Sequence, residues 1–214
     1  MIQGAIFDVD GTLLDSMPIW DTLANDYLRS LRIEPRENLA EVFKTFSLSQ
    51  SAKYYQDVYG VTLSEEEIIA GLNQVMEDFY RFQAPLKPGV KDFLHSLKES
   101  GVKLCIATAT DRPLIEAALE RCGVLSLFSR IFTCGEVGHS KNQPDIYRKA
   151  QEHLGTPKEN TWVFEDAFHG ANTAKKDGFP VAAVFDPSES QQAELKEVAD
   201  IYLESFAAAD IQTF

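Results

Sequence analysis

Hydrophobic residues from residue 88 onward alternate between the period of a helix and the short apolar runs of buried strands. Helical spacing from Val90, Leu114, Pro144 and Ala167 predicts four helices, which end at Gly101, Gly123, Gly155 and Gly178 as C-terminal caps. Apolar runs predict strands at residues 103–108, 130–133, 161–164 and 180–185, with a weaker one at 199–203. Strands that alternate with helices imply right-handed crossovers and a parallel sheet covered on both faces. The pattern therefore predicts an α/β fold.

Residues 15–84 break this alternation and predict helices only. Apolar residues give a broad hydrophobic face at helical spacing: Ile19, Leu23, Tyr27 and Leu31. Ser64 and Glu67 form a capping-box pattern before a second clear helix. Shorter helices are expected at residues 39–43 and 52–58. The segment is expected to form a small helical bundle, because no part of it predicts a strand.

The two patterns divide the chain into two predicted domains. Residues 1–14 and 85–214 are expected to form a Rossmann-like core, and residues 15–84 an all-helical domain inserted after the first strand. The linkers that join them are candidates for hinges. With 214 residues and 44% apolar content, the chain can bury a sizeable core.

Composition and charge narrow the classes of function. The formal charge of −13 opposes contact with phosphate backbones, so no nucleic-acid partner is expected. No stretch is long and apolar enough for a membrane span, and the first residues lack the basic and apolar regions of a signal peptide. We therefore expect a soluble, cytoplasmic protein without a membrane partner, and a monomer. Cys105 and Cys122 are expected to be small core residues, since the three cysteines show no paired metal spacing.

Two acidic residues close the first apolar strand of the chain, in the run from Ala5 to Leu13. Asp8 and Asp10 are two residues apart, so on an extended chain both side chains point to the same side. Two like charges about 4 Å apart repel by about 4 kcal/mol at the effective dielectric of a protein. Such a pair needs a cation, a shared proton or a charged ligand. The alternative is an edge strand with two solvated carboxylates, which the apolar residues before Asp8 disfavour.

Other polar residues follow the remaining strands, where ligands gather at the carboxyl edge of a parallel sheet. The second strand ends at Thr108, Ala109 and Thr110, and the fourth at Glu165 and Asp166. Lys141 stands in the loop before a helix. Each residue alone has an ordinary explanation, such as a helix cap or a surface charge. Acidic groups that converge on one edge are best explained by a divalent cation, and Mg²⁺ suits carboxylate and carbonyl oxygens.

These residues, in this order, resemble the four motifs of the haloacid dehalogenase superfamily of phosphohydrolases. The motifs are Asp8-Val-Asp10-Gly-Thr-Leu, Thr108, Lys141 and Glu165-Asp166. The helical insertion resembles the C1-type cap of the subfamily that contains β-phosphoglucomutase and many sugar-phosphate phosphatases. The resemblance implies a Mg²⁺-dependent phosphohydrolase that acts on a small phosphorylated metabolite.

The resemblance also implies a role for each matching residue. Asp8 would attack phosphorus and become an aspartyl phosphate, and Asp10 would serve as general acid and then as general base. Thr108 and the backbone N–H of Ala109 would hold the phosphoryl oxygens, with Thr110 beside them. Lys141 would offset negative charge. The Mg²⁺ ligands would be Asp8, the carbonyl of Asp10 and Asp166, with Glu165 in support. A carboxylate needs such positive charge to approach a phosphate dianion.

The sequence departs from the mutase pattern in the inserted segment. Trp20 stands where the mutase has a histidine, and it either shapes a substrate pocket or packs within the cap. The stretch from Lys44 to Ser51 lacks the glycine and the phosphate-binding arginine of the mutase. The lysine motif has Asn142 where the family usually has proline. The departures in the inserted segment favour a phosphatase over a phosphosugar mutase, whereas Lys141 is kept because Pro144, Asp145 and Tyr147 resume the pattern of its motif.

Two alternatives stay open at this point. A phosphosugar mutase of the β-phosphoglucomutase type would interconvert hexose phosphates through a bisphosphate. A non-catalytic phosphoacceptor, like the receiver domains of signalling proteins, also clusters Asp, Thr and Lys on a parallel sheet, but receivers carry no helical insertion. His139 and His169 border the expected site, and solvated or helix-capping roles are favoured for both because neither pairs with another histidine at ligand spacing.

Overall fold

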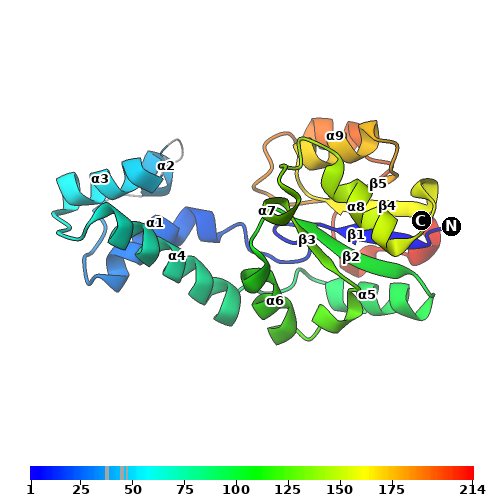
Figure 1. Ribbon diagram of the computed structural model, residues 1–214, viewed down its shortest axis with the longest axis horizontal. Helices are drawn as coiled ribbons and strands as arrows, with labels where there is room; N and C mark the ends of the chain where they lie inside the picture. Colours follow the sequence, from blue (N-terminus) through cyan, green and yellow to red (C-terminus); the bar gives the residue numbers. More distant parts are fainter. Residues whose placement is uncertain (37–38, 44–45, 47) are drawn as a thin grey trace. The chain divides into compact units, whose positions relative to one another are not determined.

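The chain forms two compact units in the computed structural model, which describes residues 1–36, 39–43, 46 and 48–214. One unit consists of Met1–Ser16 and Ala84–Phe214, and the other of Met17–Gln83. The first unit contains the sheet, and the described residues of the second are helices and their connections (Figure 1). The sequence interpretation drew the boundaries at residues 14 and 85.

Six parallel strands form one sheet in the order β3-β2-β1-β4-β5-β6. The strands are β1 (Gly4–Phe7), β2 (Lys103–Thr108), β3 (Ile131–Thr133), β4 (Thr161–Glu165), β5 (Val181–Val184) and β6 (Ile201–Leu203). Every neighbouring pair is parallel, which confirms the predicted α/β fold. The strand order reverses between β1 and β4, and sheets of this kind bind their ligands beyond the carboxyl ends of the strands at that point.

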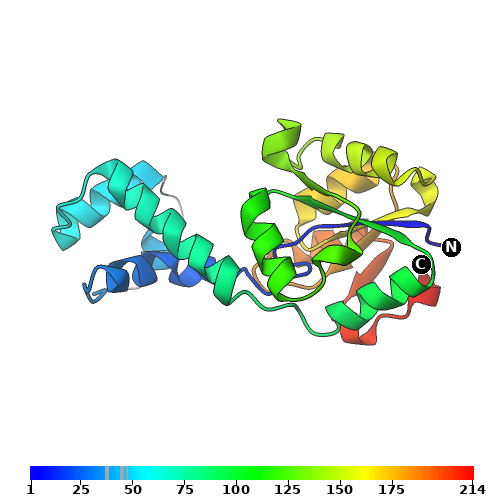
Figure 2. The same ribbon diagram turned by 60° about the horizontal axis from the view of Figure 1, so that its bottom comes forward.

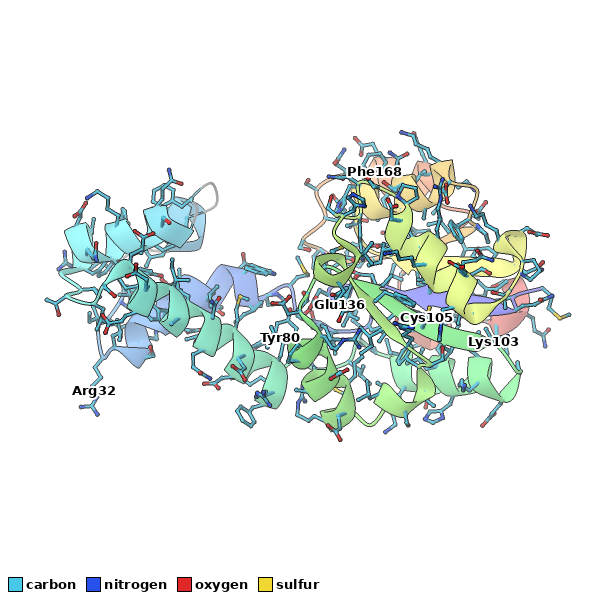
Figure 3. The ribbon with its side chains drawn as sticks, viewed as in Figure 1. Arg32, Tyr80, Lys103, Cys105, Glu136 and Phe168 are labelled. Atoms are coloured by element: carbon cyan, nitrogen blue, oxygen red, sulfur yellow. The ribbon has the colours of Figure 1, made fainter. Side chains whose placement is uncertain are left out.

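Helices and the C-terminal segment cover both faces of the sheet. The helices of this unit are α5 (Val90–Glu99), α6 (Arg112–Arg121), α7 (Cys134–Val137), α8 (Asp145–Leu154), α9 (Phe168–Lys176) and α10 (Gln192–Val198). On one face α8, α9 and α10 bury apolar side chains against the strands, and Cys105 of β2 lies in this cluster (Figure 3). On the other face Phe7 stacks on Phe164 at 4.3 Å, and Phe93 of α5 packs on Phe164 and Phe206. Figure 2 shows α5 beside the C-terminal segment.

The predicted helix ends agree with the structure. Gly155, directly after α8, has a positive φ of 62°, a conformation that glycine adopts without steric cost. The helices α7 and α10 were not predicted. The first has four residues, and the second buries only Leu195, so neither leaves a clear hydrophobic period in the sequence.

The helical unit contains α1 (Ile19–Ser30), α2 (Leu39–Phe43), α3 (Leu48–Tyr59) and α4 (Glu65–Phe82). Its core includes Tyr27 and Tyr55, whose rings lie 5.2 Å apart, and the Tyr55 hydroxyl donates to the carbonyl of Ala24 at 3.0 Å. The predicted capping box of Ser64 and Glu67 is present at the start of α4. Among the described residues, no helix has the length and apolarity required to cross a bilayer.

The chain segments that lead out of the sheet unit and back into it pair with each other. Leu14 and Leu86 form an antiparallel bridge. The Asp15 N–H donates to the Pro85 carbonyl at 2.9 Å, and the Lys87 N–H donates to the Leu13 carbonyl at 2.9 Å. The chain therefore leaves the sheet unit and returns to it at adjacent positions, next to the loop that carries Asp8 and Asp10.

Candidate active site

Asp8 follows directly after β1 and lies at the carboxyl edge of the sheet. Its N–H donates to the Phe164 carbonyl of β4 at 3.0 Å, which continues the parallel pairing by one residue. The side chain is buried, and its Oδ1 lies 2.5 Å from the Lys141 ammonium. Since β1 and β4 are neighbours, the acidic residues that end β4 lie beside Asp8.

Lys141 joins two of the acidic residues. Its ammonium contacts Asp8 at 2.5 Å and Glu165 Oε1 at 2.6 Å, and only 5% of the side chain is exposed. Burial favours loss of the proton, but the carboxylates of Asp8 and Glu165 outweigh it and raise the pKa of Lys141 above its ordinary value. The lysine therefore stays charged inside the site.

Glu165 is the last residue of β4 and is fully buried. Its Oε1 accepts from Lys141 and from the hydroxyl of Tyr147 in α8, at 2.6 and 2.7 Å. Gly170 of α9 leaves room for this arrangement, because a Cβ there would lie 2.7 Å from the Glu165 carboxyl carbon and 2.9 Å from the Tyr147 hydroxyl. The other oxygen, Oε2, is buried without a hydrogen-bond partner.

Asp166 contacts the loop that follows β1. The Thr12 hydroxyl donates to its Oδ1 at 3.0 Å. Gly11 has a φ of 74°, and a Cβ there would lie 2.2 Å from Asp166 Oδ2, so only glycine allows this close approach. Burial, and next the charge of Glu165, raise the pKa of Asp166 to about 7.

Three buried carboxylates form a group that fits a divalent cation. Asp8, Glu165 and Asp166 each offer an oxygen, and these oxygens lie within 4.8 Å of one another. The pKa of Asp8 lies well above its ordinary value. Burial is the largest cause, the charges of Glu165 and Asp166 add to it, and the charge of Lys141 only partly opposes it. One lysine does not balance three carboxylates, and Glu165 Oε2 lacks a partner. The donors are all oxygens, the ligand type that Mg²⁺ prefers.

The sequence-based expectation placed Asp10 beside Asp8 on one extended strand, and the charge of Asp10 is among the causes that raise the pKa of Asp8. The strand ends at Phe7, and Asp10 has its own hydrogen-bond donors. The Ser16 hydroxyl donates to Oδ1 at 2.6 Å, and the Thr110 hydroxyl donates to Oδ2 at 2.6 Å. The Asp10 carboxylate is therefore oriented by hydroxyl groups, outside the group of three carboxylates.

The remaining expected residues lie in different surroundings. Thr108 is buried at the end of β2, where its hydroxyl accepts from the Thr110 N–H at 3.1 Å, and Ala109 is exposed. Trp20 lies in α1 of the helical unit with 51% of its surface exposed. In the stretch compared with the mutase loop, residues 44, 45 and 47 are outside the described residues. His139 lies 3.5 Å from Asp145, an ordinary surface pairing.

Sequence reasoning missed three side chains that contact this site or its loops: Ser16, Lys87 and Tyr147. Tyr147 fits the apolar face of α8, and its hydroxyl on that face was the one signal that it has a polar partner. Ser16 lies in the expected linker, where serine is common. Nothing in the local sequence distinguishes Lys87.

Comparison with known proteins agrees with the fold and the motifs. A family model described as haloacid dehalogenase-like hydrolase matches residues 5–184. The chain belongs to this family. It is 29% identical to the protein CbbY of Cereibacter sphaeroides, over 97% of this chain and 94% of the relative. It is also 29% identical to hexitol phosphatase B of Escherichia coli K12, over 81% of this chain and 79% of the relative.

Solved structures show the same fold over nearly the whole chain. A structure described as a putative β-phosphoglucomutase from Thermotoga maritima has a TM-score of 0.84, with 22% identity and coverage of 96% of this chain and 95% of that chain. A complex of CbbY from Rhodobacter sphaeroides with xylulose-1,5-bisphosphate has a TM-score of 0.73, with 26% identity and coverage of 97% and 96%. The resemblance to the haloacid dehalogenase superfamily is confirmed, and the enzyme is a phosphomonoester hydrolase of this family. This membership sets aside the receiver-like alternative.

Proposed function

We propose that this enzyme is a Mg²⁺-dependent phosphatase that hydrolyses a small phosphorylated sugar through a phosphorylated Asp8. The observation that carries the proposal is the group of three buried carboxylates with Lys141 at the reversal point of the sheet. Relatives named as a hexitol phosphatase and as CbbY, the latter solved with a sugar bisphosphate, support the substrate class. The helical unit would serve as the cap that excludes water from the reaction.

Asp8 is the proposed nucleophile. Its carboxylate would attack phosphorus, and the bond from phosphorus to the substrate oxygen would break as the aspartyl phosphate forms. Lys141 contacts Asp8 directly, so its charge lies where the phosphoryl group would arrive. This charge would favour the ionised carboxylate and would lower the repulsion between it and the phosphate dianion.

Asp10 is the proposed proton carrier. In the first step it would protonate the leaving oxygen, and in the second it would take a proton from the water that attacks the aspartyl phosphate. The Ser16 and Thr110 hydroxyls hold its two oxygens and so fix its orientation. Thr108, the Ala109 N–H and Thr110 would bind the phosphoryl oxygens.

Asp8, Glu165 and Asp166, with the carbonyl of Asp10, are the proposed ligands of Mg²⁺. A bound Mg²⁺ would supply the positive charge that keeps these carboxylates ionised together and draws the phosphate to the site. Tyr147 and Lys141 orient Glu165 through Oε1, which leaves Oε2 available as a ligand.

Phosphate release from a panel of sugar phosphates, with and without Mg²⁺, tests this proposal. We expect Mg²⁺-dependent release by the wild-type enzyme, no release by Asp8→Asn, and wild-type release by Asp145→Asn, a control at the exposed start of α8. Full activity of Asp8→Asn, or activity independent of Mg²⁺, would contradict the proposal. Interconversion of hexose 1- and 6-phosphates without phosphate release, measured by chromatography of the sugar phosphates, would show mutase activity instead.

A further inference from the structure

Lys87 lies on the segment that returns from the helical unit, and its side chain points into the sheet unit. Only 12% of the side chain is exposed. The ammonium donates to the Gly11 carbonyl and, at 2.7 Å, to the Phe185 carbonyl. It also lies 2.8 Å from Asp186 Oδ2. The ammonium thus contacts two loops at the carboxyl edge of the sheet, through two hydrogen bonds and one ion pair.

Asp186, the ion-pair partner of Lys87, is itself held in place by hydrogen bonds. Its side chain is 1% exposed and follows β5 by two residues. The N–H and hydroxyl of Ser188 donate to Oδ1 at 3.0 and 2.6 Å, and the side-chain amide of Gln192 donates to the Asp186 carbonyl at 2.6 Å. Burial would raise the pKa of Asp186, but Lys87 and Ser188 outweigh it and lower the pKa. The pair is therefore charged although it is buried.

The contact with Gly11 places the Lys87–Asp186 pair beside the loop that carries Asp10, the proposed proton carrier. Gly11 follows Asp10 and precedes Thr12, which donates to Asp166. The short loop after β1 is therefore held from two sides, by Asp166 through Thr12 and by Lys87 through the Gly11 carbonyl. A buried ion pair is a weak source of stability because both ions lose water. Its three directed contacts are better suited to holding this loop in one conformation.

We propose that Lys87, seated on Asp186, is a positioning residue that holds the Gly11 carbonyl and thereby orients Asp10 for proton transfer. The inference rests on the role of Asp10 in the proposed function. Lys87 does not need to touch the substrate, since it acts through the backbone next to Asp10. The pairing of Lys87 with Leu13 fixes its own backbone against the same loop.

The test compares two phosphate esters that differ in their need for an acid. An alkyl phosphate has a poor leaving group that must be protonated, whereas p-nitrophenolate leaves without a proton. If Lys87 orients Asp10, Lys87→Met should lower kcat/KM for the alkyl ester by about 10- to 100-fold, with a smaller loss for p-nitrophenyl phosphate. This parameter reports the transfer to Asp8 with release of the leaving group, and not the later hydrolysis of the aspartyl phosphate that both esters share. Equal losses for both esters, or no loss, would overturn the inference.

One further variant separates positioning from stability. The double variant Lys87→Met with Asp186→Asn removes both charges, so it leaves no unpaired ion buried. Its melting temperature should recover toward wild type while the selective loss on the alkyl ester persists. Recovery of both would show a purely structural pair and would overturn the inference.

Lys158→Met is the matched control. The Lys158 ammonium also donates to a backbone carbonyl and pairs with an aspartate, at 3.0 and 2.8 Å on Asp177, but it lies before β4 at the opposite edge of the sheet. We expect the same ester ratio as in wild type. Turnover of the esters by the wild-type enzyme tests the proposed function, whereas the ratio between variants tests Lys87, so the two can fail separately.

Discussion

The ammonium of Lys141 and the carboxylate of Asp8 form a buried ion pair, with Nζ 2.5 Å from Oδ1. The same ammonium also contacts Glu165, so one positive charge is shared by two carboxylates. This arrangement places the lysine between the proposed nucleophile, Asp8, and a second proposed metal ligand, Glu165.

Lys141→Met should remove most of the activity. The loss of a preorganised charge at the point where phosphate arrives should lower kcat by about 100-fold or more. Steady-state kinetics at saturating Mg²⁺ would measure it. Lys149→Met, an exposed lysine of α8, is the control. Activity near wild type in Lys141→Met would exclude the assigned role of this lysine.

Mg²⁺ should stabilise the folded enzyme, because the unfolded chain does not hold three carboxylates together. At a concentration of 100 times the dissociation constant, the gain would be about 2.7 kcal/mol. Thermal melting with and without Mg²⁺ would detect it. Asp166→Asn should lose most of this gain, and Asp145→Asn should keep it. The same gain in Asp166→Asn would show that Mg²⁺ binds elsewhere.

The metal-free protein should lose stability as the pH rises. The pKa of Asp166 is about 7 in the folded state, above the value of about 3.9 in an unfolded chain. Between these values the folded state binds more protons, so this group stabilises the fold at low pH and the contribution is lost as pH rises toward 7. Urea unfolding in EDTA at pH 5 and pH 7 would show the decrease. Asp166→Asn should have a smaller decrease, and an unchanged slope in that variant would contradict the assignment.

Tyr147→Phe should weaken Mg²⁺ binding without removing it. The substitution deletes the hydroxyl that orients Glu165, and partners of this kind typically contribute at least about tenfold to metal affinity. Calorimetric titration with Mg²⁺ would measure the change. Tyr202→Phe is the control, since its hydroxyl also donates to a side chain, Gln192, at 2.7 Å. Equal affinities in the two variants would argue against a link from Tyr147 to the metal.

Local sequence patterns were sufficient to predict the fold and those candidate site residues that directly follow a strand. Glycines after the helices and apolar runs located the sheet, and residues that follow strands located Asp8, Thr108 and Asp166. The order of the strands in the sheet decides which of these residues lie close together. That order depends on how the helices pack over the sheet rather than on any local sequence pattern.

The contacts that were not predicted are those between residues distant in the sequence. Lys87 and Asp186 are far apart along the chain, and each alone is an ordinary surface residue type. Asp10 shows the same limit: its position two residues after Asp8 suggested that the two acids lie close together, but not that the Ser16 and Thr110 hydroxyls donate to the Asp10 carboxylate.

The bridge between Leu14 and Leu86 has a consequence for how this protein can be divided. Because the chain leaves the sheet unit and returns to it at adjacent hydrogen-bonded positions, the helical residues interrupt a tight hairpin. Deleting residues 17–83 and joining Ser16 to Ala84 through a short glycine-containing turn would close that hairpin at little entropic cost. We therefore expect the sheet unit to fold without the helical residues inserted in this hairpin.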